Sequence, residues 1–385
     1  MAVLHEKMFV DRIRGLSAPG HYIQGPGVLD QLIDFTEFLG DRIVFVLDTF
    51  FYKEYTEKLT KMYEGSGNEV TFTEFEGENT ESEIARVAKI VTDFKANVIV
   101  GIGGGKTLDC SRCVGLPMGI GLITCPTAAS TDAPTSSSAI VYKENGEGYL
   151  RNALFDKNPH IVLVDSAVIA KAPVRFLASG MGDALATWLE CRANEAAATA
   201  NYVYVTKLGG TRRTQASMAV AKASYELLMA KGRMAMSAAR AGLVTPALED
   251  IIEVNTLMSG MGFENTGCAF AHSISHAIYG KVETKVEPMH GEKVAYGCVI
   301  QLIMENKPVE EIDELIEFCL DVGLPITLKD LTIDPTDDNI AKIAEASKEP
   351  GLWDSEPFYI TLDMVIDAIK MADIMVEEHK ARRCK

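Results

Sequence analysis

Basic side chains are scarce in this sequence, and long apolar runs are absent. Lys and Arg total 37 against 54 Asp and Glu, which leaves a formal net charge of -17. Such a surface repels a phosphate backbone, so we expect neither nucleic acid nor an anionic membrane as a partner. No run of about 18 apolar residues occurs, and the opening MAVLHEKMFVDRIRG lacks the apolar segment of a signal peptide. We therefore expect a cytoplasmic protein.

Cysteine is sparse as well, with eight residues spread over a chain of 385. A reducing compartment would keep them as thiols. Cys110 and Cys113 form a CxxC, a spacing that redox motifs use, but both fall in the helix that we expect after a glycine loop. Helix packing is the favoured interpretation of this pair, and a redox role is the alternative.

The composition that remains is that of a globular enzyme, with 47% hydrophobic and 24% charged residues. A chain of 385 residues exceeds the size at which one core usually stops growing, which predicts two domains. In the first part, short apolar runs alternate with helical stretches, the pattern of a mostly parallel sheet with crossover helices. The expected strands are 43–47, 70–75, 97–100, 121–125 and 161–164.

Helical spacing replaces this alternation after Asp165 and predicts an all-α second part. We place an α/β domain at 1–168 and a helical domain at 169–385, with Pro173 near the boundary and a cleft between the two. The expected helices include 177–194, 246–261, 269–278, 310–322 and 362–382.

A glycine cluster, GIGGGKTLD at 101–109, follows one of the expected strands and leads into a helix. Glycines let backbone N–H groups approach a ligand, and a helix start adds positive dipole, so the segment suits a diphosphate. Two familiar patterns fail, because GxGxxG would need glycine at Lys106 and GxxxxGK[ST] would need glycine at Val100. A tight turn without a ligand remains the alternative.

Two further features of the α/β part suit a dinucleotide. Asp48 closes the strand RIVFVLD, where a carboxylate can accept ribose hydroxyls and repel a 2'-phosphate; an ordinary helix N-cap is the alternative. The loop PTAASTDAPTSSSAIVY at 126–142 is rich in hydroxyls that can lie along a cofactor, although a polar surface turn has the same composition. Asp132 is the loop's only ionisable residue before Tyr142.

Candidate metal ligands cluster in the helical part. Three of the seven histidines, His272, His276 and His290, lie in one short stretch, and the first two share a helix face. Each could also be an ordinary helix histidine. Asp183 follows two glycines in SGMGDALATWLE, where an N-cap is the alternative to a ligand.

Read together, six motifs resemble those of the glycerol dehydrogenase family: GGGKTLD, PTAASTDAPTS, ASGMGDALATWLE, VTPALE, GFENTG and HGEKVAYG. The resemblance runs from about Tyr22 to the C-terminus. It implies the fold of a superfamily that includes iron-dependent alcohol dehydrogenases and dehydroquinate synthases. That fold joins a Rossmann-like nucleotide-binding α/β domain to an all-α domain, with the active site in the cleft.

The resemblance also implies site residues. It places cofactor contacts for NAD in both the glycine loop and the hydroxyl-rich loop, zinc ligands in the helical domain, and substrate contacts beside them. The cofactor set is Asp48, Gly104, Gly105, Lys106, Thr107, Asp109, Thr127, Ser130, Ser136, Ser138 and Tyr142. The zinc set is Asp183, His272 and His290, and the catalytic or substrate-facing set is Asp132, His276 and Phe263.

The implied activity is NAD-dependent oxidation of glycerol, or a related vicinal diol, to the hydroxyketone dihydroxyacetone by metal-alkoxide hydride transfer. Close relatives continue HAIHNG where this chain has HSISHA, so Ser275 and His276 replace the usual His and Asn, and the preferred diol is left open. Another alcohol dehydrogenase of the superfamily is the main alternative. A dehydroquinate synthase-like lyase is a weaker one, because only Lys281, Lys285 and Lys293 lie near the metal histidines. By resemblance alone we expect a homo-oligomer, an octamer.

Overall fold

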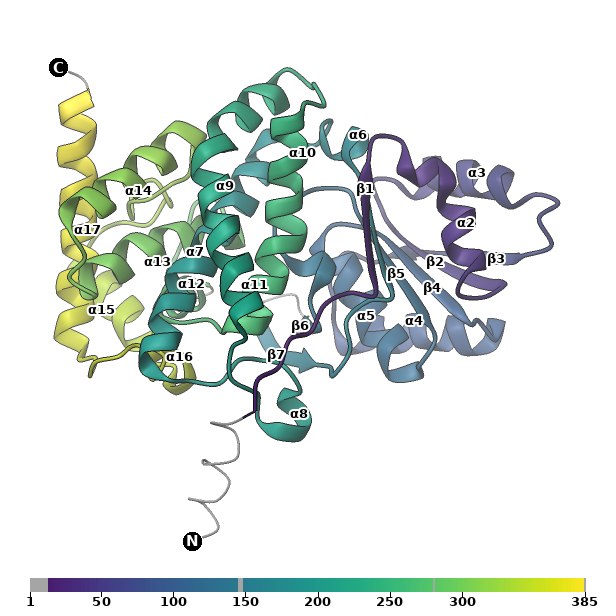
Figure 1. The fold of residues 1–385 in the computed structure, drawn as a ribbon, viewed down its shortest axis with the longest axis horizontal. Coiled ribbons are helices and arrows are strands. Elements are labelled where there is room, and N and C mark those ends of the chain that lie inside the picture. Colours follow the sequence, from purple (N-terminus) through teal and green to yellow (C-terminus); the bar gives the residue numbers. More distant parts are fainter. Residues whose placement is uncertain (1–12, 145–147, 280, 384–385) are drawn as a thin grey trace, which may run out of the picture.

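In the computed structural model, which describes residues 13–144, 148–279 and 281–383, a parallel sheet occupies one side of the molecule and a mass of helices the other (Figure 1). The opening residues, in which we expect no signal peptide, lie largely outside the described residues, which begin at position 13. The sheet has six strands in the order β1-β8-β5-β4-β2-β3, and every neighbouring pair is parallel. The strands are β1 His21–Gly25, β2 Arg42–Asp48, β3 Glu69–Phe75, β4 Val98–Gly103, β5 Gly121–Pro126 and β8 Ile161–Asp165.

Alternation along β2 explains why both faces of the sheet are covered. Phe45 and its i±2 neighbours pack in one cluster with α3 (Tyr52–Tyr63) and α2 (Leu32–Glu37), whereas Val44 and Val46 pack with α4 (Glu81–Phe94) and α5 (Gly105–Met118). A run that is apolar at consecutive positions is what a doubly covered parallel strand requires. The five strands expected from the sequence are confirmed, with ends that differ by up to three residues.

Three strands were not expected. β1 is an edge strand whose sequence HYIQG has little apolar character, and β6 (Ser138–Tyr142) and β7 (Tyr149–Leu154) form a separate antiparallel hairpin. The hairpin begins inside the hydroxyl-rich loop, so that loop is partly a strand and not only a surface turn. The remaining short elements here are the 3-10 helices η1 Val28–Gln31 and η2 Ala133–Thr135, and α6 Ser166–Ile169.

After Asp165, the described part of the chain contains helices and no strand of a sheet. They pack around one large apolar cluster that also takes in Val162 and Val164, which joins the helical part to the edge of the sheet. None of the described helices has the length and apolarity needed to cross a membrane. The helices are α7 Val174–Ala197, α8 Val205–Leu208, α9 Gln215–Arg240, α10 Pro246–Glu253, α11 Ser259–Thr266, α12 Phe270–Ile278, α13 His290–Met304, α14 Val309–Val322, α15 Asp337–Ala346, α16 Pro350–Trp353 and α17 Leu362–Arg383.

The stretch 246–261, expected as one α-helix, is interrupted by a π-helical segment, η3 (Val254–Met258). Within it, the Asn255 side-chain amide donates to the carbonyl oxygens of Ala129 and Leu177, at 3.0 and 3.1 Å. π-segments of this kind are frequent at functional sites. Here the segment ties the hydroxyl-rich loop of the α/β part to α7.

Helices α7 and α13 cross at two glycines. A methyl group built on Gly182 would lie 2.2 Å from the Gly291 carbonyl oxygen, and one built on Gly291 would lie 1.8 Å from the Ser179 carbonyl oxygen. These contacts are with backbone, which cannot rotate away. The two helices can therefore be this close only because neither residue has a side chain.

This crossing predicts that Gly291→Ala forces α7 and α13 apart. We expect overpacking to cost about 1–3 kcal/mol, measured as a lower urea midpoint, together with a lower affinity for added metal. Gly351→Ala is the matched control, because no heavy atom lies within 4 Å of a methyl group built there. Equal midpoints for the two variants would contradict the role of the crossing.

Candidate functional site

The strand order reverses at β2, which has β3 on one side and β4 on the other. Ligands of open α/β sheets bind outside the carboxyl ends of the strands at such a switch point. Asp48 is the last residue of β2, and the glycine run begins at the end of β4. The hydroxyl of Thr107 lies 3.5 Å from Asp48 Oδ2, so the two predicted cofactor segments meet there.

The glycine loop has the space that a phosphate needs. Gly104 caps α5 without a side-chain hydrogen bond, and no heavy atom lies within 4 Å of a methyl group built on it. The first amides of a helix have no partner within it, so those of α5 are available to an anion. Gly103 has a different role, because a methyl group there would lie 2.9 Å from Asp48 Cβ.

Two side chains around this loop, Lys106 and Asp48, already have partners within the protein. Lys106 Nζ lies 2.8 Å from Glu78 Oε2, and the Asp48 Oδ1 atom accepts from the Phe50 amide at 3.0 Å. The N-cap alternative for Asp48 is wrong, because α3 begins only at Tyr52.

Asp109 faces into the protein. Its carboxylate accepts from the Ile140 amide at 2.9 Å and lies 3.1 Å from fully buried Arg112. Burial raises the pKa of Asp109 to about 6, although the positive charge of Arg112 acts to lower it. Arg112 also donates to the Ala133 and Ser138 carbonyl oxygens, so the pair anchors the hydroxyl-rich loop. The neighbouring Cys110 and Cys113 are buried free thiols in α5, as helix packing predicts.

The predicted hydroxyl contacts lie on both sides of the loop's 3-10 turn. Thr127 follows β5 and donates its amide to the Gly103 carbonyl at 3.0 Å, and the Ser136 and Ser138 hydroxyls lie 2.8 Å apart. The Ser130 carbonyl accepts from the Ser179 hydroxyl of α7 at 3.1 Å. The loop thus joins the glycine loop to the helical part.

The predicted zinc ligands converge. Asp183 Oδ1 lies 3.2 Å from His290 Nε2 and 3.7 Å from His272 Nε2, and the three ligand atoms lie within 4.8 Å of one another. Asp183 lies well inside α7, so the N-cap alternative is wrong. Its side chain is 1% exposed, and Oδ1 has no hydrogen-bond donor in the structure. A buried carboxylate oxygen without a donor, facing two imidazole nitrogens, is the donor set that a divalent metal takes.

The charges of this group depend on one another. Burial alone would raise the pKa of Asp183, but His290 and His272 outweigh it and hold that pKa well below its usual range. Asp132 shows the opposite direction, because desolvation and then the charge of Asp183 raise its pKa well above the ordinary value. The Asp132 amide lies 3.4 Å from Asp183 Oδ2.

Glu190 was missed by the sequence analysis. It is fully buried, and its two oxygens take both the backbone amide of His272, at 3.0 Å, and His272 Nδ1, at 2.7 Å. Such a carboxylate places the proton on Nδ1 and turns Nε2 to the metal position. A signal for it existed, since position 190 lies seven residues after Asp183 and therefore on the same helix face. Cys268 completes a second potential ligand group with Glu190 and His272, in which the Glu190 contact is explained by this hydrogen bond.

A chain of hydroxyls connects Asp132 to α7. Ser259, at the start of α11, donates to Asp132 Oδ2 at 3.2 Å, and its hydroxyl lies 3.0 Å from that of Thr187. Thr187 is the residue one turn after Asp183. In this chain the position contacts α11: a methyl group on Gly262 would lie 2.0 Å from Thr187 Cγ2.

The other two substrate-facing candidates, His276 and Phe263, lie outside the group of ligand atoms. His276 is half exposed and its Nδ1 lies 2.9 Å from Glu349 Oε2, while its ring centroid is 6.2 Å from that of His272. Phe263 is partly buried, with its ring centroid 6.2 Å from that of Tyr202. The structure therefore brings Asp183, His272, His290 and Asp132 together and leaves His276 outside that group.

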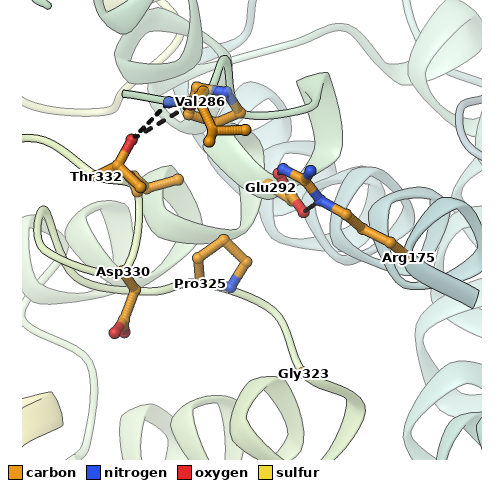
Figure 2. Close-up of a pocket in the computed structure, with 9 residues that line it drawn as sticks. Arg175, Val286, Glu292, Gly323, Pro325, Asp330 and Thr332 are labelled. Atoms are coloured by element: carbon orange, nitrogen blue, oxygen red, sulfur yellow. Dashed lines mark hydrogen bonds and ion pairs between the residues drawn. The ribbon is translucent and has the colours of Figure 1, made fainter. Parts of the chain in front are cut away.

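A cavity of about 260 Å³ adjoins this scaffold without containing the candidate residues. Figure 2 shows its wall, where Arg175 near the start of α7 makes a two-pronged ion pair with Glu292 of α13, at 2.6 and 2.7 Å. Glu292 also accepts from the Met289 amide at 2.8 Å and so fixes the turn that begins at His290. The cavity therefore lies beside residues that support His290, and none of the candidate site residues lines it.

The Glu190 contact predicts that Glu190→Gln weakens metal binding without unfolding the protein. A glutamine amide can donate to Nδ1, which would move the imidazole proton to Nε2 and block that ligand atom. We expect about a 10–100-fold loss of metal affinity, as for other such supporting carboxylates, measured by titration of metal-free protein. Glu195→Gln is the control, because its side chain is on the same helix and 45% exposed. Metal affinity unchanged in Glu190→Gln would sink the assignment.

The chain was compared with known families, curated proteins and solved structures. The model of the iron-containing alcohol dehydrogenases matches residues 19–166. A glycerol dehydrogenase of Citrobacter freundii is 38% identical over 96% of this chain and 100% of its own length. A glycolaldehyde reductase of Halobacterium salinarum is 37% identical over 93% and 96%. The crystal structure of glycerol dehydrogenase from Schizosaccharomyces pombe superposes with a TM-score of 0.87 at 32% identity, over 96% of this chain and 93% of that one. The chain therefore belongs to the glycerol dehydrogenase family of oxidoreductases, related to the iron-containing alcohol dehydrogenases.

Proposed function

We propose that this protein oxidises small vicinal diols with NAD, and glycerol to dihydroxyacetone in particular, with zinc held by Asp183, His272 and His290. The observation that carries the proposal is the buried Asp183 Oδ1 atom, which has no donor and faces two imidazole nitrogens. The names of two relatives, glycerol dehydrogenase and glycolaldehyde reductase, support the substrate class. Glycerol is itself a vicinal diol, and reduction of glycolaldehyde yields one.

The chemistry divides between bound groups and the chain. When bound, NAD would accept the hydride that leaves carbon, and zinc would lower the pKa of the reacting hydroxyl, whose proton would pass to solvent. Asp132, beside the ligand group, accepts a hydrogen bond from the second hydroxyl of the diol. Despite the raised pKa of Asp132, its carboxyl group keeps an oxygen that can accept this bond whether ionised or neutral, because the Ser259 hydroxyl contacts Oδ2 alone. Ser259 and Thr187 hold Asp132 in this orientation.

The cofactor preference follows from Asp48. Its carboxylate stands at the switch point of the sheet, where it can accept adenosine ribose hydroxyls. A 2'-phosphate at that position would be repelled by a like charge. We therefore propose NAD and not NADP as the cofactor.

The choice of zinc rests on the ligand count. Three protein ligands with one open position are typical of catalytic zinc, and the residue one turn after Asp183 is Thr187, whose hydroxyl is a poor metal ligand. The Thr187 hydroxyl lies 3.0 Å from that of Ser259, its partner in the chain of hydroxyls. The lyase alternative needs free cations for an anionic substrate, yet the Lys293 side chain is 4% exposed and its ammonium is paired with Glu287.

The substrate proposal predicts a large preference for diols. NADH formation from glycerol and 1,2-propanediol should exceed that from 1-propanol by several orders of magnitude, because a site built to pair a hydroxyl rejects analogues without it by about 10⁴-fold. Asp132→Ala should reduce this preference and leave NADH binding unchanged. The same assay with NADP in place of NAD should be much slower, because Asp48 would repel the 2'-phosphate. If monoalcohols react as fast as diols, the protein is a general alcohol dehydrogenase instead.

The metal proposal predicts about one zinc per chain by elemental analysis of the purified protein. A chelator should abolish NADH formation while circular dichroism and NADH binding stay unchanged. His290→Ala should lose the metal and His276→Ala should keep it, because only His290 lies in the ligand group. Metal retained in His290→Ala and lost in His276→Ala, or iron in place of zinc, would contradict the ligand set.

A further inference from the structure

Four side chains from the two halves of the molecule form a ladder beside the glycine loop. In the α/β half, Lys106 Nζ lies 4.9 Å from the ring centroid of Tyr142. In the helical half, Lys293 Nζ lies 4.5 Å from the ring centroid of Tyr279. The two rings meet across the halves at a centroid distance of 6.3 Å and an angle of 59°. We name Lys106, Tyr142, Tyr279 and Lys293 the cross-domain ladder.

The contacts of the ladder are of a kind that holds side chains in place. An ammonium is attracted to an aromatic face, most strongly when it is shielded from water, and tilted ring pairs at this distance are favourable. The Lys293 side chain is 4% exposed, and its second partner is Glu287 Oε1 at 3.0 Å. Lys293 therefore fixes both Tyr279 and the loop that contains Glu287.

The position of the ladder connects the two parts of the proposed site. Lys106 and Tyr142 are predicted cofactor contacts. Tyr279 directly follows α12, which carries His272, and Lys293 lies one turn into α13, which begins at His290. The helices that carry the predicted metal ligands thus reach the cofactor loop through one pair of rings.

We propose that Tyr279 and Lys293 are positioning residues for the cofactor, acting from the helical half through the face of Tyr142. This inference rests on the proposed NAD-dependent function. Tyr279 limits the tilt of the Tyr142 ring. That ring lies beside the ammonium of Lys106, which is paired with Glu78 in this structure and would pair with the diphosphate of a bound cofactor. The ladder thereby makes cofactor affinity depend on the contact between the helical half and the α/β half.

The test is NADH binding, followed by fluorescence with no substrate present, in Tyr279→Ala, Tyr279→Phe and the unmodified protein. Tyr279→Ala should weaken NADH binding roughly two- to tenfold, the fold-change that corresponds to a ring pair of ~0.5–1.5 kcal/mol. Tyr279→Phe keeps the ring and should restore the affinity. Lys293→Met should weaken binding in the same direction. Tyr359→Ala, at a side chain 87% exposed, is the control.

Two further readouts separate positioning from general damage. Adenosine, used as a competitor, has no diphosphate and should bind Tyr279→Ala and the unmodified protein equally. In turnover, KM for NAD should rise in Tyr279→Ala while kcat and zinc content stay constant. Unchanged NADH affinity in Tyr279→Ala, or an equal loss for NADH and adenosine, would overturn the inference alone. Failure of the unmodified protein to bind NADH would instead overturn the proposed cofactor.

Discussion

The backbone contact between α7 and α13 is the constraint on which the rest of the site depends. Asp183 follows Gly182, and His290 precedes Gly291, so the two residues that allow the helices to touch are neighbours of two candidate ligands. The 3.2 Å separation of Asp183 Oδ1 and His290 Nε2 is a consequence of that crossing. Arg175 and Glu292 hold the same helices together at the next turn. The packing of the two helices therefore positions the candidate metal site. A rigid helix pair leaves each carboxylate or imidazole few rotamers in which the ligand atoms converge.

The candidate site combines two parts with different physical requirements. The candidate cofactor part depends on backbone: a strand switch point, glycines and the first amides of α5. The candidate metal part depends on side chains from three helices, of which Asp183 and His272 are buried and His290 is partly exposed. The hydroxyl-rich loop joins them, because Asn255 and Ser179 of the helical half bind its carbonyl oxygens while Arg112 of the α/β half binds its far end. Asp132 can stand next to the ligand group only because both halves fix that loop.

Much of this could be predicted from the sequence, and what could not has physical causes. The five apolar strands were predictable because doubly covered strands are apolar at consecutive positions, whereas the edge strand β1 has no such pattern. The ligands Asp183, His272 and His290 were assigned by resemblance, since spacing alone joined only His272 to His276. The π-helical turn at Asn255 could not be predicted, because its hydrogen bonds go to residues far away in the sequence. Glu190 was within reach, since it shares a face of α7 with Asp183 and Thr187, but nothing local indicates that a buried glutamate supports a histidine.

Two residues of α12, Ser275 and His276, lie next to the candidate ligand group. Proteins of 37–38% identity to this chain include both a glycerol dehydrogenase and a glycolaldehyde reductase, so this level of identity alone does not select between a three-carbon and a two-carbon substrate. Ser275 and His276 are the two positions where the segment HSISHA departs from the family motif that the sequence resembles. The Ser275 hydroxyl lies 3.5 Å from His290 Nδ1, and His276 turns to Glu349 at the periphery. A small hydroxyl beside His290 and the contact of His276 with Glu349 set the volume and polarity around the candidate ligand group. We therefore expect substrate specificity to depend on the residues around the candidate metal ligands more than on the ligands themselves.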